Sequence, residues 1–178
     1  MDARSRHDRL ADALRRIADG SPFLHSLVQR HPGTIRAIEE AGLAGAIATG
    51  LAAAEEEDVG RMLRVQRQLV SLATGLADLA GLASFEEVVA QLSSFADHAL
   101  DCAIRAAIRE RAPGEEPRGM AALALGKHGS RELNYSSDID PILIFDPATL
   151  PHRAREEPVE AAVRITRRVL ELLQTRDA

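Results

Sequence analysis

Apolar positions recur at helical spacing through most of this chain. Within each stripe they fall three or four residues apart, which places them on one face of a helix. The stripes cover residues 10–17, 23–28, 35–38, 59–76, 88–108 and 159–173. The pattern therefore predicts a series of amphipathic helices before residue 112 and one more near the end of the chain.

Local signals predict where several of these helices begin and end. Ser21 before Pro22 is typical of an N-cap followed by proline at the first helical position. Ser84 and Glu87 have the spacing of a capping box. The acidic run 55–58 is expected to open the next helix at its positive dipole end. A helix is expected to end near Gly42, and the Ala- and Gly-rich stretch 42–54 is open between a loop and a weak helix.

Two short apolar runs near residue 130 predict strands. Met120–Leu125 and Ile142–Phe145 each have the length of one strand, although the first run consists of good helix formers and helix is an alternative there. The Pro- and Gly-rich segment 113–117 precedes them. We therefore expect an α+β fold, predominantly helical, in which a helical region of residues 1–112 is followed by the start of an α/β domain over 118–178.

The polar run 126–140 between the two strands carries the candidate chemistry. Asp138 and Asp140 are two residues apart, so on a strand they point to the same face, roughly 7 Å apart along the chain. Two such carboxylates can hold one or two Mg²⁺ ions, with Mn²⁺ as an alternative metal. The sequence predicts a strand that opens with two metal-binding aspartates. The competing interpretation is an ordinary turn.

The same run contains groups that can bind phosphate. Gly129 and Ser130 can bring backbone N–H groups close to phosphate oxygens, because glycine has no side chain in the way. Arg131 can grip phosphate bidentately and Lys127 as a point charge, or both can be solvated. Ser137 can donate to phosphate or shape the turn. Within the same run, we interpret His128 as incidental and Tyr135 as a packing residue.

The run 126–140 resembles a known enzyme family. Gly129-Ser130 followed after seven residues by Asp138-Ile139-Asp140 resembles the signature of DNA polymerase β-type nucleotidyltransferases. The whole run is similar to the bifunctional glutamine synthetase adenylyltransferase/adenylyl-removing enzyme. Its residues resemble the N-terminal, adenylyl-removing half of that enzyme more than the C-terminal half. Segments 21–24 and 77–79 also resemble that family, so the likeness extends over most of the chain.

The resemblance implies an activity and its partners. It implies phosphorolytic removal of AMP from an adenylylated tyrosine of glutamine synthetase, giving ADP, in the regulation of nitrogen assimilation. Transfer of AMP from ATP belongs to the family's other half. Catalysis would rest on Mg²⁺ held by Asp138 and Asp140. The expected partners are glutamine synthetase, ATP or ADP, phosphate and a PII-type regulator.

Some residues depart from the family pattern. His128, Ser130 and Pro141 stand where the family often has Leu, Gly and Leu. The resemblance also implies a third acidic residue on a neighbouring strand, in a segment that this sequence lacks. Asp146 is six residues beyond Asp140, roughly 20 Å along a strand, and too far to share its metal. A non-catalytic fragment, or a module that binds glutamine synthetase or a regulator, is therefore the alternative hypothesis.

Composition narrows the class of protein further. The 178 residues carry a net charge of −5, and domains that bind nucleic acid usually have a basic face, so we expect no nucleic-acid partner. No apolar run approaches the length of a membrane span. The single cysteine, Cys102, cannot form an internal disulfide, which is typical of a reducing compartment. These features predict a cytoplasmic protein without a membrane partner.

Overall fold

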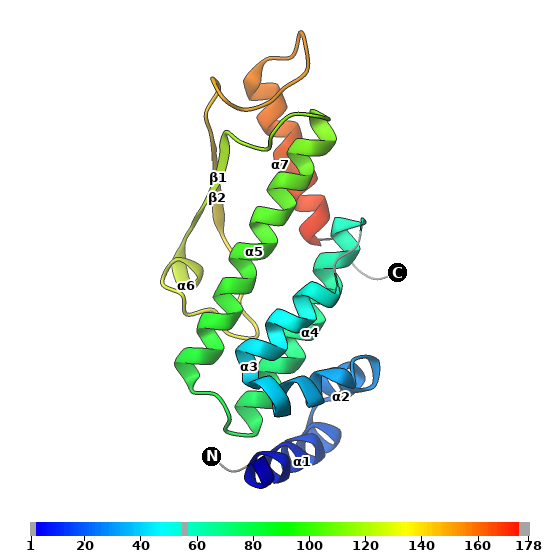
Figure 1. Cartoon of the computed structure of the whole chain (residues 1–178). Coiled ribbons are helices and arrows are strands. Elements are labelled where there is room, and N and C mark those ends of the chain that lie inside the picture. Colours follow the sequence, from blue (N-terminus) through cyan, green and yellow to red (C-terminus); the bar gives the residue numbers. More distant parts are fainter. Residues whose placement is uncertain (1–2, 55–56, 175–178) are drawn as a thin grey trace.

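The computed structural model describes residues 3–54 and 57–174, and it is mainly helical with one small sheet. This confirms the expected α+β, predominantly helical class. The elements in chain order are α1 (Ala3–Gly20), α2 (Pro22–Arg30), α3 (Gly33–Ala53), α4 (Val59–Leu79), α5 (Phe85–Arg111), β1 (Met120–Ala124), α6 (Gly126–Gly129), β2 (Pro141–Phe145) and α7 (Pro158–Gln174). Figure 1 shows α1 and α2 at one end of an elongated molecule and the β1–β2 hairpin with α7 toward the other.

The predicted helix starts at Ser21 and Ser84 are confirmed. The Ser21 side chain accepts a hydrogen bond from the Leu24 amide. At α5 the capping box is complete, because Ser84 accepts from the Glu87 amide at 3.2 Å and Glu87 accepts from the Ser84 amide at 2.7 Å. Each bond satisfies an N–H that the helix itself leaves without a partner.

α4 begins directly after the acidic run, as predicted. The helix begins at Val59, and the Asp58 side chain caps it by accepting from the Arg61 amide at 3.0 Å. Residues 55 and 56 of the acidic run lie outside the described part of the chain. Asp58, the last residue of the run, thus lies at the N-terminus of α4, where the helix dipole favours a negative charge.

The stretch 42–54 is helical, one of the two alternatives left open, and the helical geometry is interrupted at Gly42, where a helix was expected to end. α3 continues to Ala53 across a kink at Gly42, which has φ 70° and ψ −174°. Glycine adopts this backbone conformation without the steric penalty that a side chain would incur. The helix resumes because the residues after the kink, Ala46 and Ile47, are buried against its neighbours.

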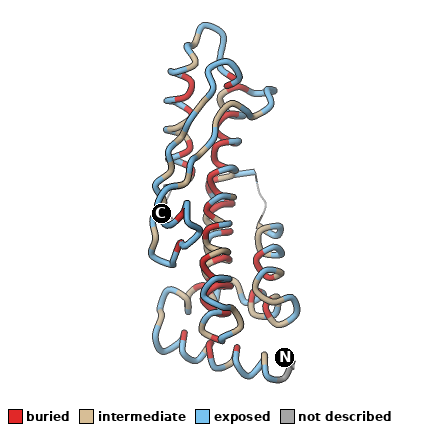
Figure 2. Tube along the Cα trace, turned by 90° about the vertical axis from the view of Figure 1, so that its left-hand side faces the viewer, coloured by how far each residue is buried: buried red, intermediate tan, exposed pale blue. Residues whose placement is uncertain are grey.

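Two hydrophobic clusters form the core, and α5 contributes to both. The first joins buried residues of α1 to α4, including Leu10, Ile38 and Leu76. The second joins α4, α5 and α7, with the inner face of the hairpin packed against it. Figure 2 shows buried positions along the long central helices and exposed ones over much of the hairpin. The second cluster therefore contains residues from both sides of the segment 113–117.

β1 and β2 pair as an antiparallel hairpin, which confirms both predicted strands. Ala124 faces Pro141 at one end of the ladder and Met120 faces Phe145 at the other. Burial alternates along both strands. The inner residues pack toward α5, whereas the outer face exposes large apolar side chains, at Leu123, Ile142 and Ile144. The inner face of the hairpin is thus partly buried against the second cluster, to which α5 contributes.

Candidate functional site

The polar run after β1 folds into a tight turn around the short helix α6. The amides of Gly129 and Ser130 donate to the carbonyls of Leu125 and Gly126, at 3.1 and 3.0 Å. A Cβ atom at Gly129 would lie 2.6 Å from the Ala124 carbonyl oxygen. Glycine is therefore required at position 129, because the turn folds back onto the end of β1. The two amides that were predicted to bind phosphate are instead hydrogen-bonded to backbone carbonyls of the turn.

His128 fixes this turn to α5, a role that the sequence did not reveal. Its side chain is buried, and its Nε2 lies 2.8 Å from the Asp97 carboxylate. Its Nδ1 is buried without a hydrogen-bond partner among the described residues. A hollow of about 260 Å³ between α5 and β1 is also lined by His128. The interpretation of His128 as incidental was therefore wrong, and its partner 31 residues away could not be found from local sequence.

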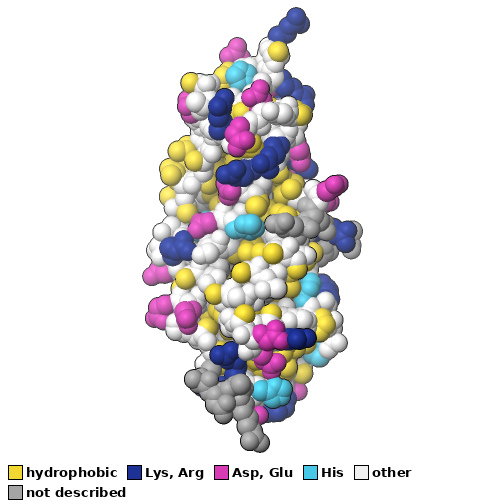
Figure 3. All heavy atoms as spheres, viewed as in Figure 1, with side chains coloured by type: hydrophobic (Ala, Val, Ile, Leu, Met, Phe, Trp, Pro, Cys, Tyr) yellow, Lys and Arg dark blue, Asp and Glu magenta, His cyan; other side chains and the backbone are white. Residues whose placement is uncertain are grey.

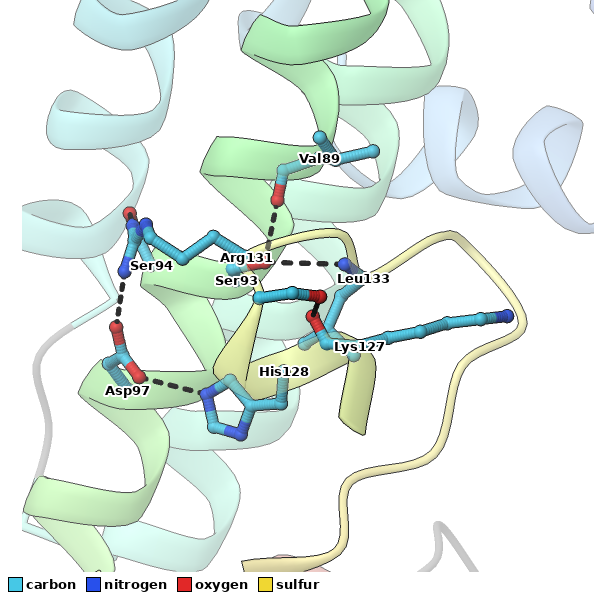
Figure 4. Close-up of polar contacts among 9 residues, drawn as sticks. Val89, Ser93, Ser94, Asp97, Lys127, His128, Arg131 and Leu133 are labelled. Carbon is cyan, nitrogen blue, oxygen red and sulfur yellow. Dashed lines mark hydrogen bonds and ion pairs between the residues drawn. The ribbon is translucent and has the colours of Figure 1, made fainter. Parts of the chain in front are cut away.

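Arg131 is held on the same helix. It adopts a left-handed backbone conformation with φ 61°, and its guanidinium donates to Asp97 at 3.0 Å and to the Ser94 hydroxyl at 2.6 Å. Beyond it, the Leu133 amide lies 3.4 Å from the Ser93 hydroxyl. Figure 4 shows these side chains of α5 facing the turn. Of the two predicted cations, Arg131 is thus engaged by the protein itself.

Lys127 points away from α5, opposite to Arg131 (Figure 4). It is exposed, and it is the only lysine in the 178-residue sequence. The Ser130 hydroxyl donates to Glu132 at 3.0 Å. Ser137 exchanges hydrogen bonds with Asn134, accepting from its amide at 3.0 Å and donating to its side chain at 2.9 Å. Ser137 therefore shapes the turn, the alternative that the sequence had left open.

Asp138 and Asp140 lie just before β2, which corrects the prediction that the strand opens with them. β1 ends at Ala124, opposite Pro141, so no strand residue remains to pair with either aspartate. The alternation of exposed and partly buried residues seen along β2 nevertheless extends back to Asp138, because both aspartates are exposed and Ile139 between them is partly buried. Within residues 3–54 and 57–174 neither carboxylate has a hydrogen-bond or salt-bridge partner. Both carboxylates are therefore exposed to solvent and available for a ligand.

One further contact fastens the loop that carries these aspartates, and another set of contacts orders the turn after β2. The Tyr135 hydroxyl donates to Asp78 of α4 at 3.1 Å, so Tyr135 is more than the packing residue expected. Burial, with the charge of Asp78, raises the pKa of Tyr135 well above its usual range. The Asp146 carboxylate caps the turn after β2, and the Ala148 amide, followed by Thr149, lowers its pKa.

Neither a group of metal ligands nor a membrane-spanning helix is found among the described residues. No three His, Cys, Asp or Glu side chains in the described part of the chain are grouped closely enough to hold a metal ion. Nor does any helix described here have the length and apolar character needed to cross a bilayer. On the face drawn in Figure 3, basic and acidic side chains are interspersed.

Comparison with known proteins identifies the family. The model of the family described as glutamate–ammonia ligase adenylyltransferase matches residues 11–178. The chain belongs to this family. Similar adenylyltransferase-family proteins include one from Xanthobacter autotrophicus, 36% identical over 91% of this chain, and one from Caulobacter vibrioides, 34% identical over 88%. Both are named bifunctional glutamine synthetase adenylyltransferase/adenylyl-removing enzyme.

The match covers only part of those adenylyltransferase-family relatives. The chain spans 18% of the length of the Xanthobacter protein and 19% of a Rhodopseudomonas palustris relative that is 33% identical to it. No solved structure matches the chain. Family membership confirms the resemblance that the run 126–140 had indicated, and the chain corresponds to a fragment of the adenylyltransferase.

Proposed function

We propose that this chain carries part of the nucleotidyl-transfer site that removes AMP from an adenylylated tyrosine of glutamine synthetase. Family membership supports the general role, and the names of the relatives support the protein substrate. The carrying observation is that Asp138 and Asp140 are both exposed and have no hydrogen-bond or salt-bridge partner among the described residues. The removal of AMP, as opposed to its transfer, is proposed because the sequence of the run 126–140 resembles the adenylyl-removing half of the family.

The donor set at the pair fits Mg²⁺. Magnesium binds oxygen ligands and commonly uses one or two carboxylates, with waters and substrate phosphates completing its shell. Asp138 and Asp140 would supply those two carboxylates, with Mn²⁺ as the alternative metal. When bound, the metal would neutralise charge on the phosphates. Because the residues described include no third acidic ligand nearby, we expect other parts of the enzyme to complete the site.

The chain's own contribution to the reaction would be positioning and charge. An oxygen of inorganic phosphate attacks the phosphorus of AMP, and the bond from that phosphorus to the tyrosine oxygen breaks. The products are ADP and, once its oxygen takes up a proton, free tyrosine. Phosphate is already an anion, so the step needs no strong general base. Lys127, the exposed cation of the turn, would attract the phosphates by charge.

The test is calorimetric binding of ADP with Mg²⁺ to this chain and to the Asp138→Asn/Asp140→Asn variant. We expect metal-dependent binding that the double variant loses, because it removes both carboxylate charges. The matched control is Glu115→Gln/Glu116→Gln, which removes two exposed charges from the segment after α5. Equal affinity in the wild-type chain and the aspartate variant would reject the metal assignment.

The single lysine provides a second readout. Periodate-oxidised ADP forms a Schiff base with a nearby amine, which borohydride then reduces to a stable adduct. We expect the label on Lys127, and we expect unlabelled ADP with Mg²⁺ to protect it. Labelling restricted to the N-terminal amine would place the nucleotide elsewhere.

The second candidate function is protein binding without catalysis. The observation in its favour is the exposed apolar face of the hairpin, formed by Leu123, Ile142 and Ile144, since contiguous exposed apolar surface often marks a protein contact. In this case the chain would bind glutamine synthetase equally well with and without Asp138 and Asp140. Pull-down of purified glutamine synthetase by the two forms distinguishes the hypotheses.

A further inference from the structure

We propose that Asp97 of α5 is a positioning residue for the turn 126–133, and that it sets how this turn presents Lys127 and the following aspartates. The consequence for nucleotide binding rests on the proposed function, whereas the effect on the turn does not. Asp97 is not part of the sequence motif. It lies 31 residues before His128.

One carboxylate holds both sides of the Gly-Ser pair. The Oδ1 atom of Asp97 lies 2.8 Å from His128 Nε2, and its Oδ2 atom accepts from Arg131 at 3.0 Å. His128 and Arg131 immediately flank Gly129 and Ser130. The two contacts therefore fix the ends of this four-residue segment relative to α5.

Neighbouring residues of α5 form a row with Asp97. Ser93, Ser94 and Asp97 are separated by helical spacing of one to four residues and face the turn together (Figure 4). Ser94 accepts from Arg131 at 2.6 Å, and Ser93 lies within hydrogen-bond distance of the Leu133 amide. The row thus contacts the turn at several points, and Asp97 is its only charged member.

The backbone of Arg131 indicates that these contacts constrain the turn. A non-glycine residue with φ 61° costs free energy and persists when surrounding contacts favour it. The guanidinium of Arg131 makes two such contacts, with Asp97 and Ser94. Asp97 belongs to neither hydrophobic cluster and its side chain is half exposed. Its loss should therefore release the turn and leave both clusters packed.

The first test is amide hydrogen exchange, followed by NMR in this chain. The amides of Gly129, Ser130, Arg131 and Glu132 all donate to carbonyls within the turn. Hydrogen bonds to charged groups stabilise by more than neutral ones, so in Asp97→Asn we expect these amides to exchange at least about tenfold faster. Exchange along α4 and α7 should be unchanged.

Asp101→Asn is the matched control. Asp101 lies one turn further along α5 and pairs with Arg105 of the same helix at 2.8 Å. The substitution removes the same charge from the same helix without a contact to the turn. Unchanged turn exchange in Asp97→Asn, or an equal increase in Asp101→Asn, would overturn the proposal.

The second test measures affinity for ADP with Mg²⁺ by calorimetry. We expect Asp97→Asn to weaken binding about threefold or more, and to have no further effect in a chain that already carries His128→Gln and Arg131→Gln. Such non-additivity is the signature of residues that act through one another. A full effect of Asp97→Asn in that background would refute the positioning role.

The two proposals fail in different ways. If the wild-type chain binds no ADP with Mg²⁺, the nucleotide site fails and hydrogen exchange alone decides the role of Asp97. If the wild-type chain binds and Asp97→Asn changes the exchange but not the affinity, Asp97 supports the turn without positioning the site, and the proposal is rejected.

Discussion

Gly129→Ala should strain the turn at its closest approach to β1. The new Cβ atom would lie 2.6 Å from the Ala124 carbonyl oxygen and 3.2 Å from its carbonyl carbon. Carbon–oxygen contacts in proteins are normally about 3.3 Å or longer. The turn and the end of β1 would have to separate by about 0.7 Å. Both contacting atoms belong to the backbone, so no side-chain rotation can relieve the clash.

Two opposing effects set the size of the change at Gly129. Overpacking of this kind costs about 1–3 kcal/mol, whereas replacing glycine by alanine stabilises by about 0.4–1 kcal/mol through the unfolded chain. The clash is the larger effect. We therefore expect Gly129→Ala to destabilise the turn by about 1–2 kcal/mol.

Amide exchange of the turn and urea unfolding measure this change. The amide of residue 129, which donates to Leu125, should exchange about tenfold faster in Gly129→Ala. Gly20→Ala is the control, because a Cβ atom there meets nothing within 4 Å. If the turn amides exchange equally fast in Gly129→Ala and Gly20→Ala, and the two variants unfold at the same urea concentration, the steric argument is refuted.

Two further predictions concern stability. Hydrogen bonds from Arg111, with the nearby charge of Arg164, hold the pKa of Glu156 below its ordinary 4.5. The ionised Glu156 therefore stabilises the fold at pH values above its ordinary pKa, and this stabilisation is lost as the pH falls through its lower pKa in the folded protein. Glu156→Gln should cost about 1.5–3 kcal/mol of unfolding free energy at pH 7 and less at pH 3, measured by urea unfolding. Equal costs at the two pH values would contradict the stabilising role of the Glu156 carboxylate. Leu76→Ala, at a fully buried side chain, should cost about 2–5 kcal/mol in the same assay, whereas Phe23→Ala, 61% exposed, should change little; similar losses would contradict the core assignment.

Local sequence predicted the parts of the fold that local physics determines. Ser21 and Ser84 cap the helices that begin one residue later. Each capping bond joins residues only three apart, so local sequence was enough to predict it. The two-residue period of extended chain also predicts the observed alternation, in which Asp138 and Asp140 are exposed and Ile139 is partly buried. These features need no knowledge of distant contacts.

Features that depend on distant partners were missed. The strand after Asp140 begins only at Pro141, because the length of the ladder is set by where β1 ends. The interpretations of His128 and Tyr135 failed because their partners, Asp97 and Asp78, lie 31 and 57 residues away. No spacing rule connects a loop to a helix face at such separations.

The continuity of α5 has a mechanical consequence. Its 27 residues span about 40 Å, and every one has helical geometry, whereas α3 bends at Gly42. Phe95 of α5 packs against both clusters, and Asp97 lies two residues further along. A sliding of α5 against its neighbours therefore carries Asp97 with it as part of a rigid rod. Helix shifts of about 1–2 Å exceed what a hydrogen bond tolerates, so such a shift would release His128 and Arg131 together.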